Sequence, residues 1–123
     1  MTQQDYLQAL RSLYLQLPNT HRRFSRSDRQ LASVLYQRGF SFDLVRSALL
    51  LATARRLAHD PDHPLPPVRS LHYFVPVIEE IQKQPLLTGY VQYLERKIRS
   101  LSSAHSHPAN SAQTGVRSKN RVS

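Results

Sequence analysis

The chain has 123 residues, no cysteine and a formal net charge of +9, and fourteen of its seventeen basic residues are arginine. This length suffices for one domain that buries a core, and the absence of cysteine excludes a disulfide framework, a thiol redox role and a thiolate metal site. The longest apolar run is too short to span a bilayer and the first residues lack the features of a signal peptide, so we expect a cytoplasmic protein without a membrane partner.

The first two predicted helices flank a basic loop. Apolar residues at three- and four-residue steps predict an amphipathic helix over residues 3–17, which Pro18 ends. A polar segment rich in arginine follows, and its last residues, 27–30, fit a capping box. We therefore expect a second helix over residues 28–38. Its apolar residues define the face expected to turn to the core: Leu31, Val34 and Leu35.

A glycine-containing turn and a leucine-rich helix follow. Gly39 suits a left-handed C-cap, and Ser41 suits the N-cap of a third helix that runs to about residue 59. Leucine lies on nearly all sides of that helix, whereas a helix that reads a DNA groove exposes one polar face. We therefore expect a core helix that is polar only at its ends. Three arginines near those ends are candidate nucleic-acid ligands: Arg46, Arg55 and Arg56.

Two more helical segments are predicted after a proline-rich break. Apolar spacing predicts a helix over residues 70–84, which Pro85 ends and in which Pro76 either kinks the helix or marks its true first turn. Thr88 is the expected N-cap of a last helix, whose apolar stripe ends at Leu101. The residues that follow are rich in Ser, Asn and Ala, and we expect them to be disordered.

Together these elements predict an all-α fold. We expect a compact bundle of about five helices with a helix-turn-helix-like centre. The helical domain is expected over residues 1–103, and a disordered basic tail over residues 104–123.

Charge is unevenly distributed along the chain. Residues 1–56 hold nine arginines against three acidic residues, residues 57–103 hold five basic and five acidic residues, and residues 104–123 hold three basic residues and no acid. A basic front half and a basic tail favour a polyanionic partner, and arginine can hold a phosphate in its planar fork. The alternative is that the charge only maintains solubility.

The densest group of basic residues is the loop HRRFSRSDR, at residues 21–29. Its arginines can join the N–H groups of a helix N-terminus in binding phosphate, and its aromatic residue can stack on an unpaired base. Alternatively, the arginines form a solvated face and the aromatic residue is a hydrophobic staple of the second helix. The candidate ligands in this loop are Arg22, Arg23, Phe24, Arg26 and Arg29.

Two apolar patterns resemble a known helical module. The segment GFSFDLVRSAL, at residues 39–49, is similar to the glycine-turn-helix signature in the C-terminal module of DnaD-type replication proteins. Tyr73 and the apolar residues after it resemble that module's motif Tyr-x-x-x-Ile-Leu-x-x-Trp, with Ile81 in place of the tryptophan and Pro76 inside the motif. The resemblance covers residues 28–85 and implies DNA binding and helicase loading during replication, with Tyr73 as the residue carried over. Read without the resemblance, Tyr73 is a core aromatic with its hydroxyl at the surface.

Metal and catalytic chemistry find little support in the sequence. Histidine and carboxylate groups gather at residues 59–63, and His105 lies near His107, but one set is in a proline-rich loop and the other in the predicted tail. Glu79 and Glu80 are adjacent and so face different directions on a helix. No glycine-rich phosphate loop or nucleophile elbow occurs. We therefore expect no metal, no cofactor and no enzymatic activity.

The sequence favours an accessory nucleic-acid-binding protein. We expect DNA as its partner, together with a larger replication protein, and a role in replication of a chromosome or mobile element. Two alternatives stay open. One is an interaction adaptor whose neutral segment, residues 57–103, docks a larger replication or transcription protein. The other is a small transcriptional regulator that binds selected sequences as a dimer.

Overall fold

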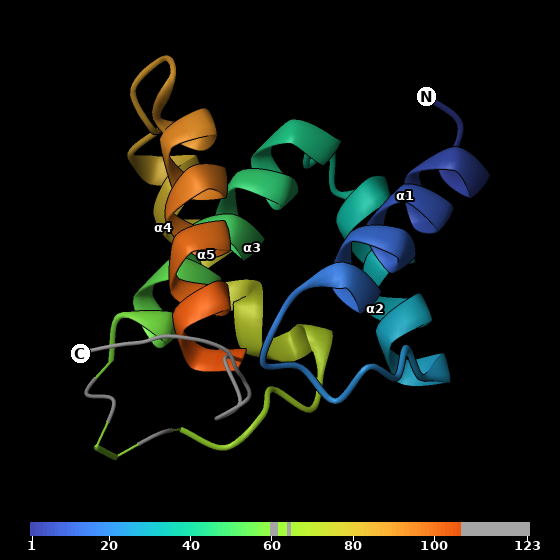
Figure 1. The fold of residues 1–123 in the computed structure, drawn as a ribbon. Coiled ribbons are helices and arrows are strands. Elements are labelled where there is room, and N and C mark those ends of the chain that lie inside the picture. The colour runs from blue at the N-terminus through green and yellow to red at the C-terminus, as the bar shows by residue number, and fades with distance from the viewer. Residues whose placement is uncertain (60–61, 64, 107–123) are drawn as a thin grey trace.

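The computed structural model describes residues 1–59, 62–63 and 65–106. Within this part of the chain the fold has five α-helices, one short 3₁₀ helix and no strand, which confirms the predicted all-α class (Figure 1). In chain order the helices are α1 (Gln3–Gln16), α2 (Arg26–Gln37), α3 (Phe42–Leu57), the 3₁₀ helix η1 (Leu71–Phe74), α4 (Val75–Lys83) and α5 (Tyr90–Ser106).

The helix α3 is the central element of the fold. The pair α1 and α2 lies on one side of it, and the pair α4 and α5 lies on the other (Figure 1). Contacts from α1, α4, α5 and η1 all reach α3, whereas α2 packs on α1 and η1. A helix contacted from so many directions must be apolar around most of its circumference.

The side chains of α3 meet that requirement, which confirms the predicted core helix. Its start is also as predicted: Gly39 has a φ of +86°, and Ser41 Oγ accepts a hydrogen bond from the Leu44 N–H at 3.1 Å. A run of leucines on all sides therefore serves packing here. The buried residues of the helix are Val45, Ala48, Leu49, Leu50, Leu51, Ala52, Thr53, Ala54 and Leu57.

The helix α2 begins earlier than the sequence predicted, because a different serine caps it. Ser25 Oγ accepts a hydrogen bond from the Asp28 N–H at 3.2 Å, and Asp28 Oδ2 accepts one from the Ser25 N–H at 2.9 Å. This reciprocal pair is a capping box, and it displaces the predicted box that begins at Ser27. An aspartate can accept with a full negative charge, which strengthens both its bonds and its fit to the helix N-terminus.

The new cap changes which face of α2 is buried. Asp28 is turned inward, and Ala32 and Leu35, one and two turns further on, are buried with it. Val34 stays 44% exposed and Leu31 is only partly buried. The prediction was therefore right for Leu35, right in part for Leu31, which packs against the core while partly exposed, and wrong for Val34, because the inward-facing aspartate sets the rotation of the helix.

The segment around Pro76 contains two short helices instead of one kinked helix. A 3₁₀ turn, η1, leads into α4, and Pro76 lies in the first turn of α4, where its missing N–H removes no hydrogen bond. Ser70 Oγ caps η1 by accepting from the His72 N–H at 3.1 Å. The buried residues of this segment are Leu71, Phe74, Ile78 and Ile81.

The last helix, α5, begins and ends later than predicted. Gly89, with a φ of +86°, directly precedes it, so the expected N-cap Thr88 lies in the turn before the helix. The helix continues to Ser106, past the expected start of the tail, because no proline or glycine interrupts the chain before Pro108. The rest of the predicted tail, residues 107–123, lies outside the described residues.

Candidate nucleic-acid interface

The basic loop is tied to the proline-rich segment by an isolated β-bridge between Thr20 and Val68. The His21 N–H donates to the Val68 carbonyl at 2.7 Å, and the Val68 N–H donates to the Asn19 carbonyl at 2.9 Å. Asn19 and Arg22 have left-handed backbones, with φ values of 61° and 58°, which turn the chain on either side of the bridge. The loop therefore follows a fixed path from α1 to α2.

Asp28 ties the end of this loop to η1. The residue is 1% exposed, and its Oδ1 accepts hydrogen bonds from the Leu71 N–H at 2.9 Å and the Ser70 hydroxyl at 3.1 Å. Its Oδ2 accepts from the N-cap of α2, as described above. A buried carboxylate whose two oxygens accept hydrogen bonds from two different segments anchors those segments to each other. It holds the first turn of α2, which carries two of the candidate arginines, against η1.

The four candidate arginines of the loop are exposed to solvent. In the described ranges, their guanidinium groups take part in no ion pair and no hydrogen bond. A rigid backbone thus presents several positive charges that no described carboxylate pairs with. These residues are Arg22, Arg23, Arg26 and Arg29.

Phe24 is half-buried and packs against α1. Its ring meets Tyr14 edge to face, with centroids 5.7 Å apart and planes at 60°. Burial, together with the nearby charge of Asp28, raises the pKa of Tyr14 from 10 to about 12, so this supporting ring keeps its phenol proton well into the alkaline range. The partner position of a hydrophobic staple is occupied by Arg29, so the staple interpretation of Phe24 does not hold.

Phe24 and Arg29 line a groove of about 590 Å³, to which α1 contributes Arg11.

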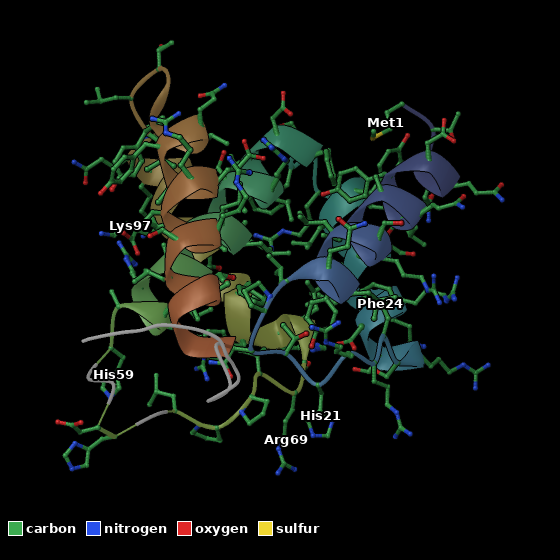
Figure 2. The ribbon with its side chains drawn as sticks, in the orientation of Figure 1. Met1, His21, Phe24, His59, Arg69 and Lys97 are labelled. Carbon is green, nitrogen blue, oxygen red and sulfur yellow. The ribbon has the colours of Figure 1, made fainter. Side chains whose placement is uncertain are left out.

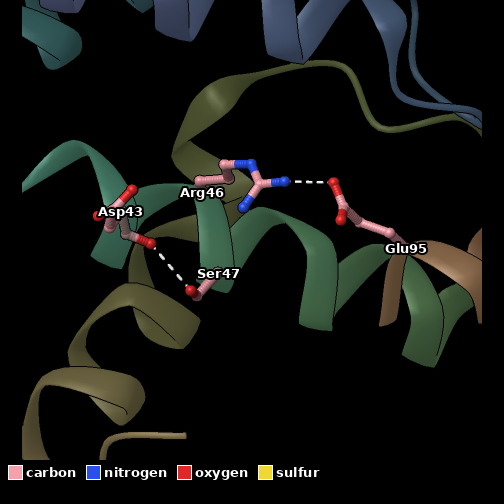
Figure 3. Close-up of polar contacts among 4 residues, drawn as sticks. All are labelled: Asp43, Arg46, Ser47 and Glu95. Atoms are coloured by element: carbon pink, nitrogen blue, oxygen red, sulfur yellow. Dashed lines mark hydrogen bonds and ion pairs between the residues drawn. The ribbon is translucent and has the colours of Figure 1, made fainter. Parts of the chain in front are cut away.

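Two of the three candidate arginines on α3 form ion pairs within the protein. Arg46 pairs with Glu95 of α5, while Ser47 Oγ donates to the backbone carbonyl of Asp43 one turn earlier (Figure 3). Arg55 makes two hydrogen bonds to the Glu80 carboxylate of α4, at 2.9 and 2.6 Å. These arginines hold α4 and α5 to the central helix and do not lie with the basic loop.

Arg56 and Tyr73 form a separate contact. The Arg56 guanidinium donates to the Pro66 carbonyl and lies over the Tyr73 ring, 5.0 Å from its centroid. Tyr73 is 45% exposed and touches Phe74 edge to face, so it is a surface residue and not a core aromatic. The nine candidate residues therefore fall into one group of five in the loop and smaller groups elsewhere.

Two arginines that sequence reasoning missed belong near the loop. The β-bridge places Arg69 beside His21, and both side chains point away from the helices (Figure 2). No sequence signal could find this pair, because the bridge joins residues far apart in the chain. Arg11 lies one turn after Leu7 on α1, and both line the groove next to Phe24. Helical spacing could have placed these two residues on one face, but not opposite the loop.

The remaining ionisable groups of the described residues form no cluster that could bind a metal ion. Within the described ranges, no three His, Cys, Asp or Glu side chains lie close enough to hold a metal ion. Asp60 and His107, from the two histidine-containing segments, lie outside these ranges. Hydrogen bonds from Arg55 lower the pKa of Glu80, which keeps that carboxylate ionised as an ion-pair partner.

Comparisons with models of protein families, with curated proteins and with solved structures found no match for this chain. Among the helices described, none is long and apolar enough to cross a membrane. A function for this chain is therefore inferred from its own residues.

Proposed function

We propose that this protein is an accessory nucleic-acid-binding protein that contacts DNA phosphates through the basic loop and the first turn of α2. The contrast between two sets of arginines carries this proposal. Arg46 and Arg55 are already paired with glutamates, whereas the four arginines of the loop have no partner in the described part of the chain. An exposed, unpaired guanidinium can bind phosphate and release counterions without first breaking an internal bond.

A role in replication is the finer part of the proposal, and it rests on the resemblance to the DnaD-type module. Tyr73, the residue that the resemblance carries over, is at the surface beside Arg56, where a partner can reach it. The burial of α3 favours a structural role for the helix-turn-helix-like centre, since a buried helix cannot enter a groove. The transcriptional regulator is therefore the weaker of the alternatives.

An interaction adaptor is the second candidate, and one surface favours it. Leu87, in the turn before α5, is 83% exposed. Tyr90 and Tyr93 follow on α5, both exposed, with their rings stacked at a centroid distance of 5.4 Å. Exposed tyrosine and leucine side chains grouped in this way are typical of protein interfaces. Binding of a purified replication protein that is lost in Leu87→Ser, without nucleic acid present, would support the adaptor.

The nucleic-acid proposal is tested by two triple variants that remove the same charge from different places. Arg22, Arg23 and Arg26 are changed to Ala in one, and Arg96, Lys97 and Arg99 of α5 in the other. In Figure 2, Phe24 and Lys97 mark the two sides of the molecule on which these sets lie. Three exposed charge pairs of about 0.5 kcal/mol each correspond to a roughly tenfold loss of affinity for the loop variant.

The α5 variant should bind DNA nearly as well as the parent. Equal losses in the two variants would mean that binding follows net charge and has no site in the loop. A parent protein that binds no nucleic acid at low salt would rule out the proposed function altogether.

A further inference from the structure

The groove beside the basic loop has the size and lining of a small-ligand site. Its volume of about 590 Å³ lies within the range of roughly 300–1,000 Å³ that is typical of such sites. It opens between α1 and the start of α2, immediately next to the arginines that carry the proposed function. Among the residues that line it are Gln4, Leu7, Gln8, Arg11, Phe24 and Arg29.

We propose that this groove binds one unpaired nucleotide of a single-stranded nucleic acid, with its base against Phe24 and its phosphate against Arg11 and Arg29. The inference rests on the proposed function and deepens it, because it specifies which form of nucleic acid fills the groove beside the loop. The neighbouring loop arginines then hold the phosphates on either side of the bound nucleotide.

The apolar part of the groove suits the face of a base. Phe24 is held in place by its edge-to-face contact with Tyr14, and it remains half-buried, so part of its ring is open to the groove. Leu7, also partly buried, lies beside it. An aromatic ring fixed in this way stacks on a base with little loss of side-chain entropy.

The polar part of the groove suits the rest of a nucleotide. Arg11 and Arg29 carry positive charge, and none of the residues that line the groove is acidic. Neither guanidinium has an ion-pair partner among the described residues. Gln4 and Gln8 add amide groups that can both donate to and accept from a base edge. A nucleotide offers a phosphate to the two guanidinium groups, a base edge to the glutamine amides and a flat ring to Phe24.

An unpaired strand fits this arrangement better than a duplex. In a duplex the faces of the bases are covered by their neighbours in the stack, so a ring recessed between two helices cannot reach them. A base in a single strand can turn out of its stack and enter the groove. Single-stranded nucleic acid is therefore the form that brings base and phosphate to the site together.

The test compares an oligothymidylate with an abasic strand of the same length, which has the same phosphates and no bases. The parent should bind the oligothymidylate about fivefold or more tightly than the abasic strand, as one stacked base implies. Phe24→Leu should abolish most of this preference, so that the oligothymidylate binds little more tightly than the abasic strand. Tyr93→Leu, which removes an exposed ring on α5, should keep the preference and serves as the control.

A second measurement needs no variant and so does not depend on the stability of one. In NMR spectra of the parent, the ring signals of Phe24 and the methyl signals of Leu7 should shift with the oligothymidylate and not with the abasic strand or a duplex. Equal binding of the two strands, or unshifted Phe24 signals, would overturn the nucleotide site and leave phosphate binding by the loop intact. Binding of neither strand would instead show that the proposed function itself is wrong.

Discussion

At the scale of single residues, Asp28 is the side chain that holds the proposed interface in position. Its carboxylate accepts hydrogen bonds from the Ser25 and Leu71 N–H groups and from the Ser70 hydroxyl, and so joins the loop, α2 and η1. The arginines beside it in the chain are thereby presented from a rigid frame. A flexible loop would lose more entropy on binding.

Replacing this anchor should destabilise the whole fold. Asp28→Ala leaves two backbone N–H groups without an acceptor, one of them buried, and we expect a loss of about 3 kcal/mol in the free energy of unfolding. Urea denaturation measures this loss. Asp28→Asn keeps an acceptor oxygen and should cost less. A change below about 1 kcal/mol in the alanine variant would show that the anchor is unimportant.

Two buried tyrosines should make the free energy of unfolding fall in alkaline solution. Burial raises the pKa of Tyr6 and of Tyr14 from 10 to about 12, and in the described structure neither hydroxyl has a hydrogen-bond partner. The folded protein therefore keeps phenol protons that the unfolded chain has lost, so stability is fully present below pH 10 and falls as the pH rises towards about 12.

A double variant, Tyr6→Phe with Tyr14→Phe, should remove most of that alkaline decline and leave the stability at neutral pH the same or slightly higher. Urea denaturation of both proteins at a series of pH values measures the effect. An equally steep decline in the double variant would mean that other groups cause it.

The central position of α3 is the main feature at the scale of elements. Because Leu49 is completely buried where α3 meets its neighbours, Leu49→Ala should lower the free energy of unfolding by about 3 kcal/mol, as core truncations of this kind do. Val34→Ala is the matched control, since Val34 on α2 is 44% exposed and lies outside the core, and it should change stability by less than about 0.5 kcal/mol. A melting temperature that barely moves in Leu49→Ala would mean that α3 is not the core helix.

The elements differ in how far the sequence could predict them. The start and burial of α3 follow from local signals, namely Gly39, Ser41 and leucine on every side of one helix. For α2, two overlapping serines each fit a capping box, and the choice between them depends on contacts of Asp28 with the distant Ser70 and Leu71. Local pattern alone could not decide that competition, and the predicted core face was rotated as a result.

The candidate site shows the same division between local and distant information. A polar arginine-rich loop is readily predicted to be exposed, and it is. Whether an arginine is free or paired depends on carboxylates elsewhere: Arg46 meets Glu95 and Arg55 meets Glu80 only after the helices have packed. The groove beside Phe24 likewise exists only because α1 lies against the start of α2.

At the scale of the whole molecule, the last residues of the chain carry basic charge beyond the last buried core residue of the described part. Every buried core side chain found in the described residues lies between Tyr6 and Ile98, whereas residues 107–123 add three basic residues and no acid. Deleting residues 107–123 should therefore leave the cooperative unfolding transition intact and weaken DNA binding by a small factor. Calorimetry and a binding assay on the truncated protein check the two parts. Loss of cooperative unfolding would show that the fold needs those residues.

The salt dependence of DNA binding tests the phosphate-binding loop most directly. Affinity for a short duplex is measured over a range of salt concentrations for the parent, the Arg22, Arg23 and Arg26 triple-alanine variant, and the matched α5 variant. Each lost phosphate contact should reduce the slope of log affinity against log salt by about 0.9, so the loop variant should be shallower by roughly 2 to 3 units. The α5 variant should keep the slope of the parent. A loop variant with the parent's affinity and slope would contradict the account.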